Sequence, residues 1–140
     1  MTNTDVFATT IEKTNRILKE IEEAYGWPPE RRQQSYHALT AVMHALRDRL
    51  TVEEASDLAA QLPALVRGLY YEGWKPAKVP VKMHREEFLD RIRQDFPYAL
   101  EGGAELLVRR TLAALRHYVT DGEWEDISSG MPKDLAGILP

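Results

Sequence analysis

The sequence contains an internal repeat, and this repeat restricts the fold more than any other feature. When Pro63 is aligned with Pro132, 69 positions further on, Thr51 falls on Thr120 and no gap is needed from position 35 to position 71. The breaks, the polar helix-start residues and the apolar positions all repeat together, which predicts a tandem duplication. The superposed apolar positions are Leu39 on Val108, Met43 on Leu112, Leu50 on Val119, Leu58 on Ile127, Leu62 on Met131, Val66 on Leu135, Leu69 on Ile138 and, with an upstream offset of 71, Ile17-Leu18 on Phe88-Leu89, Ile21 on Ile92 and Tyr25 on Phe96.

Each copy has the pattern of four helices. Apolar residues recur at steps of three and four, as on one face of an α-helix, and Thr51 with Glu54 and Thr120 with Glu123 have capping-box spacing. Thr4 or Asp5 is the expected cap of the first helix. The residues expected to point inward from that helix are Phe7, Ile11, Leu18, Ile21 and Tyr25, and from the fourth helix Leu65, Val66, Leu69 and Tyr70.

The predicted fold class is therefore all-α, a tandem duplication of a four-helix unit. Residues 1–71 form the first helical repeat, 72–86 a basic linker rich in Pro and Gly, and 87–140 a second, degenerate repeat. A unit of about 60–70 residues buries a marginal core on its own. We therefore expect the two repeats to pack into one compact, pseudo-two-fold helical domain.

The composition excludes several classes of protein. The chain has no cysteine, which excludes disulfides, thiol nucleophiles and Cys-based zinc or iron–sulfur sites. Its net charge of −4 is divided evenly between the two halves, so no basic region points to nucleic acid or to a membrane surface. The N-terminus, MTNTDVFATT, lacks the basic start and apolar run of a signal peptide. We expect a soluble cytoplasmic protein with no membrane span.

Histidines are the only candidates for metal or cofactor binding. His37 and His44 lie seven positions apart, on one side of the second expected helix, and His44 is four positions from Asp48. A di-iron bundle needs Glu-x-x-His pairs, and none of the four histidines has a Glu three positions earlier. No Gly-x-Ser-x-Gly or phosphate-loop motif is present either. We therefore predict no catalytic residue, no cofactor and no enzyme activity, and keep His37 and His44 only as weak metal candidates.

Aromatic and basic residues mark a possible contact surface after the fourth helix. Tyr70 is in step with the apolar face of that helix and is expected to bridge the two halves. Trp74 follows Gly73, where no helical face continues, so it is either a staple between the halves or a docking residue. We predict a partner-contact surface made of Tyr71, Trp74, Lys75 and Lys78.

The run ALTAVMHALRDRLTVEEASDLAAQLPALVRGLYYEGWKP, residues 38–76, closely resembles the family known as domain of unknown function 2267 (DUF2267). The features that carry the resemblance are the LRDRL end of a helix, the VEEA cap, the QLP break and the RGLYYEGW segment. The resemblance implies an all-helical fold with a weaker second copy, and it brings no catalytic residues.

Together these features favour a non-enzymatic protein, a small cytosolic interaction or regulatory module. The expected partner is a protein, with a homodimer as one form of that contact, and nucleic acid is not expected. The alternative from another class is a small-molecule, metal or cofactor binder that uses the groove between the repeats.

Overall fold

A computed structural model describes residues 5–140, and the chain is all-helical throughout this range. Eight α-helices and two short 3₁₀ turns are present there, and residues 5–140 contain no strand. The elements are α1 (Ala8–Tyr25), η1 (Pro29–Arg31), α2 (Arg32–Arg49), α3 (Val52–Gln61), α4 (Ala64–Tyr71), η2 (Pro76–Lys78), α5 (Arg85–Asp95), α6 (Ala104–Arg116), α7 (Asp121–Ser129) and α8 (Lys133–Ala136). No helix in this range is both long and apolar enough to cross a membrane.

Local sequence signals set most helix starts. Thr51 forms a complete capping box at α3, in which its hydroxyl accepts from the Glu54 N–H and the Glu54 side chain accepts from the Thr51 N–H. Thr120 accepts from the Glu123 N–H at α7, as predicted, but its own N–H donates to the Gln61 side chain and not to Glu123, so only half of the predicted second capping box is present. Pro63 and Pro132 directly precede α4 and α8.

The start of α1 differs from the prediction. This helix begins at Ala8 with Phe7 as its N-cap residue, and that residue makes no side-chain cap. Asp5 instead accepts a hydrogen bond from the Phe7 N–H at 2.9 Å, ahead of the helix. Thr4 lies outside the described residues.

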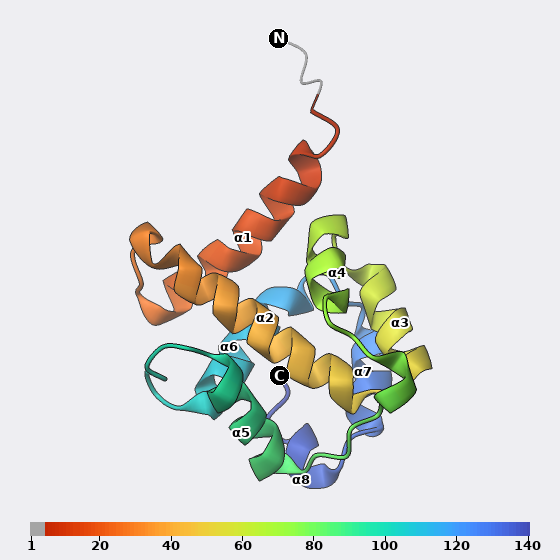
Figure 1. The fold of residues 1–140 in the computed structure, drawn as a ribbon. Coiled ribbons are helices and arrows are strands. Elements are labelled where there is room, and N and C mark those ends of the chain that lie inside the picture. The colour runs from red at the N-terminus through yellow and green to blue at the C-terminus, as the bar shows by residue number, and fades with distance from the viewer. Residues whose placement is uncertain (1–4) are drawn as a thin grey trace.

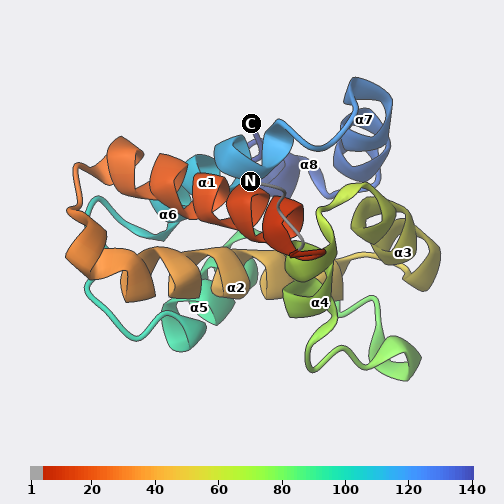
Figure 2. The same ribbon diagram turned by 90° about the horizontal axis from the view of Figure 1, so that it is seen from above.

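Helix α2 crosses the middle of the molecule and packs against α1, α4, α5 and α6 (Figure 1). Helix α1 also packs on α6, and α5 packs on both α2 and α6. Figure 2 shows α3 and α7 together at one end of the molecule, and α4 lies next to them, where it packs on α1, α2 and α3. Helices from the first and second halves of the chain are therefore interleaved around α2.

One continuous core fills the space between these helices, with Tyr70 and Phe88 among its largest fully buried side chains. Three residues that were expected to point inward are exposed. Phe7 is 66% exposed because it precedes α1 as its N-cap residue. Ile11 is 43% exposed because the first turns of α1 extend beyond the helices that cover the rest of it, as Figure 1 shows. Leu65 is 41% exposed because the short helix α4 buries the face that carries Val66 and Tyr70.

The segment between α4 and α5, residues 72–84, is named here the connecting segment, and it is tied to α2. Arg47 donates to the carbonyl oxygens of Tyr70 and Glu72, both at 2.8 Å, where the segment begins. Further along, the Val81 N–H donates to the Asp48 carbonyl at 2.7 Å, and Arg49 donates to the Met83 carbonyl at 3.1 Å (Met83 is itself buried). The predicted linker is thus bound to α2 over much of its length. Its last two residues, 85 and 86, belong to α5.

Candidate functional site

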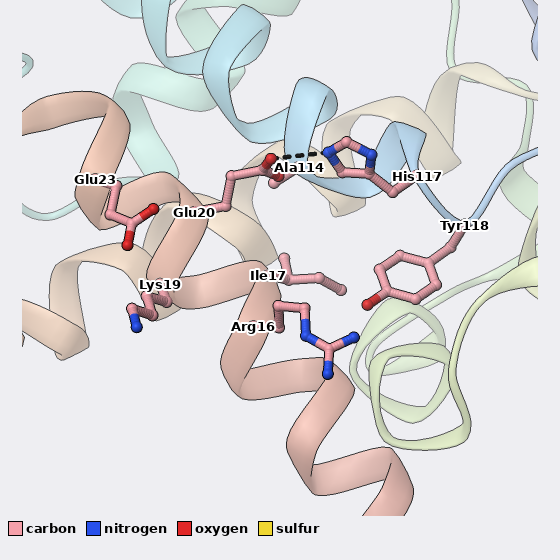
Figure 3. Close-up of a pocket in the computed structure, with 8 residues that line it drawn as sticks. All are labelled: Arg16, Ile17, Lys19, Glu20, Glu23, Ala114, His117 and Tyr118. Carbon is pink, nitrogen blue, oxygen red and sulfur yellow. Dashed lines mark hydrogen bonds and ion pairs between the residues drawn. The ribbon is translucent and has the colours of Figure 1, made fainter.

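A groove with a volume of about 620 Å³ lies between α1 and α6. Its floor is apolar, because Ile17 and Ala114 are buried there. Its walls are polar and ionisable. Figure 3 shows the full lining, which consists of Arg16, Ile17, Lys19, Glu20, Glu23, Ala114, His117 and Tyr118.

A hydrogen bond joins the two walls of this α1/α6 groove. Glu20 Oε1 on α1 lies 2.8 Å from His117 Nε2, just beyond the end of α6. In Figure 3 the Arg16 guanidinium and the Tyr118 hydroxyl point toward each other at a distance from this pair. The groove therefore offers both signs of charge along its length above an apolar floor, an arrangement suited to binding a polar chain.

A second, smaller pocket of about 240 Å³ lies where the connecting segment passes α2 and α5. Asp48 is one of the residues that line it. Asp48 Oδ1 accepts from Arg47 Nε at 2.8 Å, and Oδ2 accepts from Arg91 Nη2 at 2.9 Å. Burial acts to raise the pKa of Asp48, but the hydrogen bonds from Arg47 and Arg91 outweigh it and hold that pKa below its ordinary value. We name this the connecting-segment pocket, and its lining is Arg47, Asp48, Gly73, Lys75, Lys78, Val79, Val81 and Arg91.

The two histidines proposed as weak metal candidates are engaged separately. His44 Nε2 lies 2.8 Å from the Leu69 carbonyl oxygen, and burial lowers the pKa of His44. The His37 ring lies 5.3 Å from the Tyr36 ring and 5.7 Å from the Tyr98 ring. Within residues 5–140, no three His, Asp or Glu side chains are grouped so that they could hold a metal ion.

The four residues predicted to contact a partner fall into two pairs. Tyr71 and Trp74 are partly buried, pack against the core, and have ring centroids 5.2 Å apart. The Trp74 indole N–H is buried and has no acceptor among the described residues. Lys75 and Lys78 are exposed and line the connecting-segment pocket. The contact surface stays a prediction, and its aromatic half also takes part in packing.

Tyr70 is fully buried, and its hydroxyl donates to the Ala55 carbonyl at 3.0 Å. It lies in the core among side chains of α2, α3, α6 and α7, which come from both halves of the chain. This position agrees with the expectation that Tyr70 bridges the two halves.

Sequence reasoning overlooked the pairs that join α1 to α6 and α5 to α2. Glu20 and His117 lie 97 positions apart, too far for any local pattern to connect them. The repeat alignment held the signal, because it superposes Glu20 on Arg91 and Asp48 on His117. Under this alignment, a contact between Glu20 and His117 predicts a contact between Arg91 and Asp48, and the reverse also holds.

Comparison with known proteins gives a family for this chain. The model of a family described as an uncharacterized conserved protein, DUF2267, matches residues 14–138. No curated protein matches the sequence. Because the match spans most of the chain, the protein belongs to the DUF2267 family.

Proposed function

We propose that this DUF2267 protein is a protein-interaction module, built from two copies of a four-helix unit, that binds an extended segment of a partner protein in the α1/α6 groove. One observation carries the proposal. The surface that the repeat alignment makes equivalent to this groove, between α5 and α2, is already occupied in part by the connecting segment, whose Val81 N–H donates to the Asp48 carbonyl.

The helix contacts support the duplication on which this comparison depends. Under the repeat alignment α1 exchanges with α5 and α2 exchanges with α6. The contact of α1 with α6 therefore becomes the contact of α5 with α2, and both are present. The contacts of α2 with α6 and of α3 with α7 map onto themselves, as contacts across a pseudo-two-fold axis do.

The side chains at equivalent contacts support the same relation. Glu20 on α1 bonds His117, while the aligned pair, Arg91 on α5 and Asp48 on α2, is an ion pair at 2.9 Å. The acidic and basic partners have exchanged places between the two contacts. Such an exchange is expected if the two contacts descend from one ancestral contact.

The last pair of helices in each copy shows a similar exchange, in which the large aromatic residue and the smaller residue change places between the two helices. In the first copy Tyr70 of α4 reaches the backbone of the small residue Ala55 in α3. The aligned residues are Leu139 and Trp124, and here the large aromatic is on α7, with its indole N–H donating to the Pro140 carbonyl at 2.7 Å. Each pair thus has one large aromatic, which supports a common origin.

The covered surface suggests how the open groove is used. At α2, the Val81 N–H of the connecting segment donates to the Asp48 carbonyl. The aligned acceptor in the open groove is the carbonyl of His117, for which no donor is present among residues 5–140. We expect a backbone N–H of the partner segment to occupy that position, above the apolar floor of Ile17 and Ala114.

The lining favours a peptide over the alternative of a small molecule or cofactor. Sites for small ligands are enclosed and mostly apolar, with few polar groups. In the α1/α6 groove, by contrast, most lining side chains are ionisable. The cytoplasmic location expected from the sequence stays a prediction.

Affinity capture with matched variants tests this function. The baits are the wild-type chain, a groove variant with Glu20→Lys and Glu23→Lys, and a control with Glu125→Lys, an exposed charge reversal on α7. We expect one or more proteins to be recovered with the wild type and the control and to be depleted with the groove variant. Recovery of the same proteins in the same amounts with all three baits would overturn the assignment of the groove.

The captured partner can also be a second copy of this chain. In that case untagged copies of the chain would be recovered together with the tagged wild-type bait. Sedimentation of the purified wild type and groove variant distinguishes this case. A dimer that the groove variant loses would make the partner segment part of another DUF2267 chain.

A further inference from the structure

The connecting-segment pocket has more positive charge than its carboxylates balance. The arginines are neutralised within the cluster, since Asp48 accepts from both Arg47 and Arg91, and Asp95 accepts from Arg91 at 2.9 Å. Lys75 and Lys78 add two further positive charges, and among residues 5–140 neither has a carboxylate within salt-bridge distance. The pocket therefore has an excess of about two positive charges.

The two lysines are held close together by a turn of the segment. Lys75 directly precedes the 3₁₀ turn η2 and Lys78 is its last residue, and a hydrogen bond from the Lys78 N–H to the Lys75 carbonyl at 2.9 Å closes the turn. Both line the pocket.

The backbone that carries these lysines is fixed to α2 on either side of the turn. The Arg47 bonds to the Tyr70 and Glu72 carbonyls precede the turn, and the bond from the Val81 N–H to the Asp48 carbonyl follows it. Charged groups on a fixed backbone lose less conformational freedom when they bind a ligand than the same groups on a free loop.

Arg91 adds directional donors to this charge. A guanidinium has five N–H donors, and the bonds of Arg91 to described residues engage only its Nε and Nη2 atoms. The carboxylate that would oppose an anion, Asp48, is already bonded to an arginine through each of its oxygens. A planar guanidinium beside two ammonium groups is a typical arrangement for recognising a phosphate group.

We propose that the connecting-segment pocket binds a phosphate group, as inorganic phosphate or as a small phosphate monoester, through Lys75, Lys78 and Arg91. A dianion of this kind matches the excess charge of the pocket, and a volume of about 240 Å³ limits the ligand to a phosphate group with a small substituent. The site is separate from the α1/α6 groove, so it stands or falls independently of the proposed function.

Titration of the full chain with inorganic phosphate and with O-phosphoserine, followed by calorimetry and amide NMR, tests the site. The variant Lys75→Gln/Lys78→Gln removes two charges from the pocket, and Lys13→Gln/Lys133→Gln removes two charges from α1 and α8 as a matched control. We expect the pocket variant to raise the Kd at least about tenfold, because hydrogen bonds to charged groups are lost, and the control to leave the Kd within about twofold.

The two probes separate the sources of the phosphate group. Tighter binding of O-phosphoserine would identify a monoester as the ligand, and equal binding would identify free phosphate. Equal Kd values for the two variants, NMR shifts that lie away from residues 73–81 and Arg91, or no binding of either probe at millimolar concentration would each overturn the proposal.

Discussion

At the scale of single residues, the side chains that define this protein are polar or aromatic groups held inside or beside the core. Glu22 is buried and accepts from the Arg32 guanidinium at 3.0 and 3.1 Å and from the Ser35 hydroxyl at 2.7 Å. These bonds join α1 to α2 close to the turn between them. Trp74 has the opposite character, because its ring is packed while its N–H lacks an acceptor among the described residues.

Glu22 gives the protein a component of stability that depends on pH. Burial acts to raise the pKa of Glu22, but the bonds from Arg32 and Ser35 outweigh it, so the folded-state pKa lies below the ordinary value of 4.5. A lowered folded-state pKa stabilises the fold above the unfolded-state pKa, and this stabilisation is lost as the pH falls through the folded-state pKa.

We therefore expect Glu22→Gln to lower the free energy of unfolding by about 2 kcal/mol at neutral pH. The difference from wild type should shrink as the pH falls below about 4.5, where the unfolded chain binds a proton, and should be lost below the folded-state pKa, where the wild-type carboxylate is itself protonated. Urea unfolding at a series of pH values measures both effects. A difference that stays constant with pH would contradict the role given to the charge.

Trp74 can be tested with two substitutions that separate its ring from its N–H. Trp74→Ala removes a partly buried ring that packs against the core and should lower the free energy of unfolding by about 2 kcal/mol. Trp74→Phe keeps most of the ring and removes a buried donor without an acceptor, so its loss should be less than about 1 kcal/mol.

Equilibrium urea unfolding of both Trp74 variants gives these values, with sedimentation to record any association. Equal losses for Ala and Phe would mean that the indole N–H has a partner in solution. If Trp74→Ala kept its stability and lost an association that wild type shows, Trp74 would be a docking residue rather than a staple.

At the scale of helices, the ends are held partly by local residues and partly by distant ones. The caps at Thr51 and Thr120 were predictable, because a capping box is contained within four consecutive residues. The N-terminus of α4 has no such signal. The Leu65 N–H donates to the hydroxyl of Thr10 on α1, at 2.8 Å, which no local pattern encodes.

The local caps should each contribute measurably. We expect Thr51→Ala and Thr120→Ala each to lower the free energy of unfolding by about 1 kcal/mol, the usual loss at an N-cap. Thr40→Ala is a matched control within α2, where the residue caps nothing, and it should change stability by less than about 0.5 kcal/mol. Chemical unfolding that shows no difference among the three variants would contradict the capping assignments.

The second capping box also departs from its local pattern in a way that only the fold explains. The Thr120 N–H donates to the Gln61 side chain at 2.8 Å, whereas the equivalent Thr51 N–H donates to its own Glu54. Gln61 lies at the end of α3, which packs on α7. The sequence thus predicts that a helix starts at Thr120, but not that a residue from the other half completes the cap.

At the scale of the whole molecule, the helical periodicity made the all-α fold class predictable, whereas the position of the groove depends on how distant helices pack. The prediction of an all-helical chain followed from periodicity and caps, and residues 5–140 have this fold. The α1/α6 groove was not predictable as a set of residues, because its two walls come from helices about 90 positions apart. The exposure of Ile11 likewise depends on where other helices end and not on the pattern within α1.

The interleaving of α1 with α6 and of α5 with α2 has a consequence for how copies of this chain can combine. Every contact between the halves would be equally satisfied if the two halves came from different chains, which is the condition for domain swapping. The two halves can pair within one chain only because the connecting segment turns back along α2. Three hydrogen bonds from arginine side chains and one backbone hydrogen bond hold the segment there.

Deleting residues 76–79 would shorten that return path. Halves that can no longer reach each other within a chain should pair between chains, because the short tether removes the advantage of intramolecular contact. We expect size-exclusion chromatography and sedimentation to show a helical dimer for the deletion variant, with thermal unfolding that depends on protein concentration. A folded monomer would contradict this prediction, because it would show that the two halves can pair within one chain without residues 76–79.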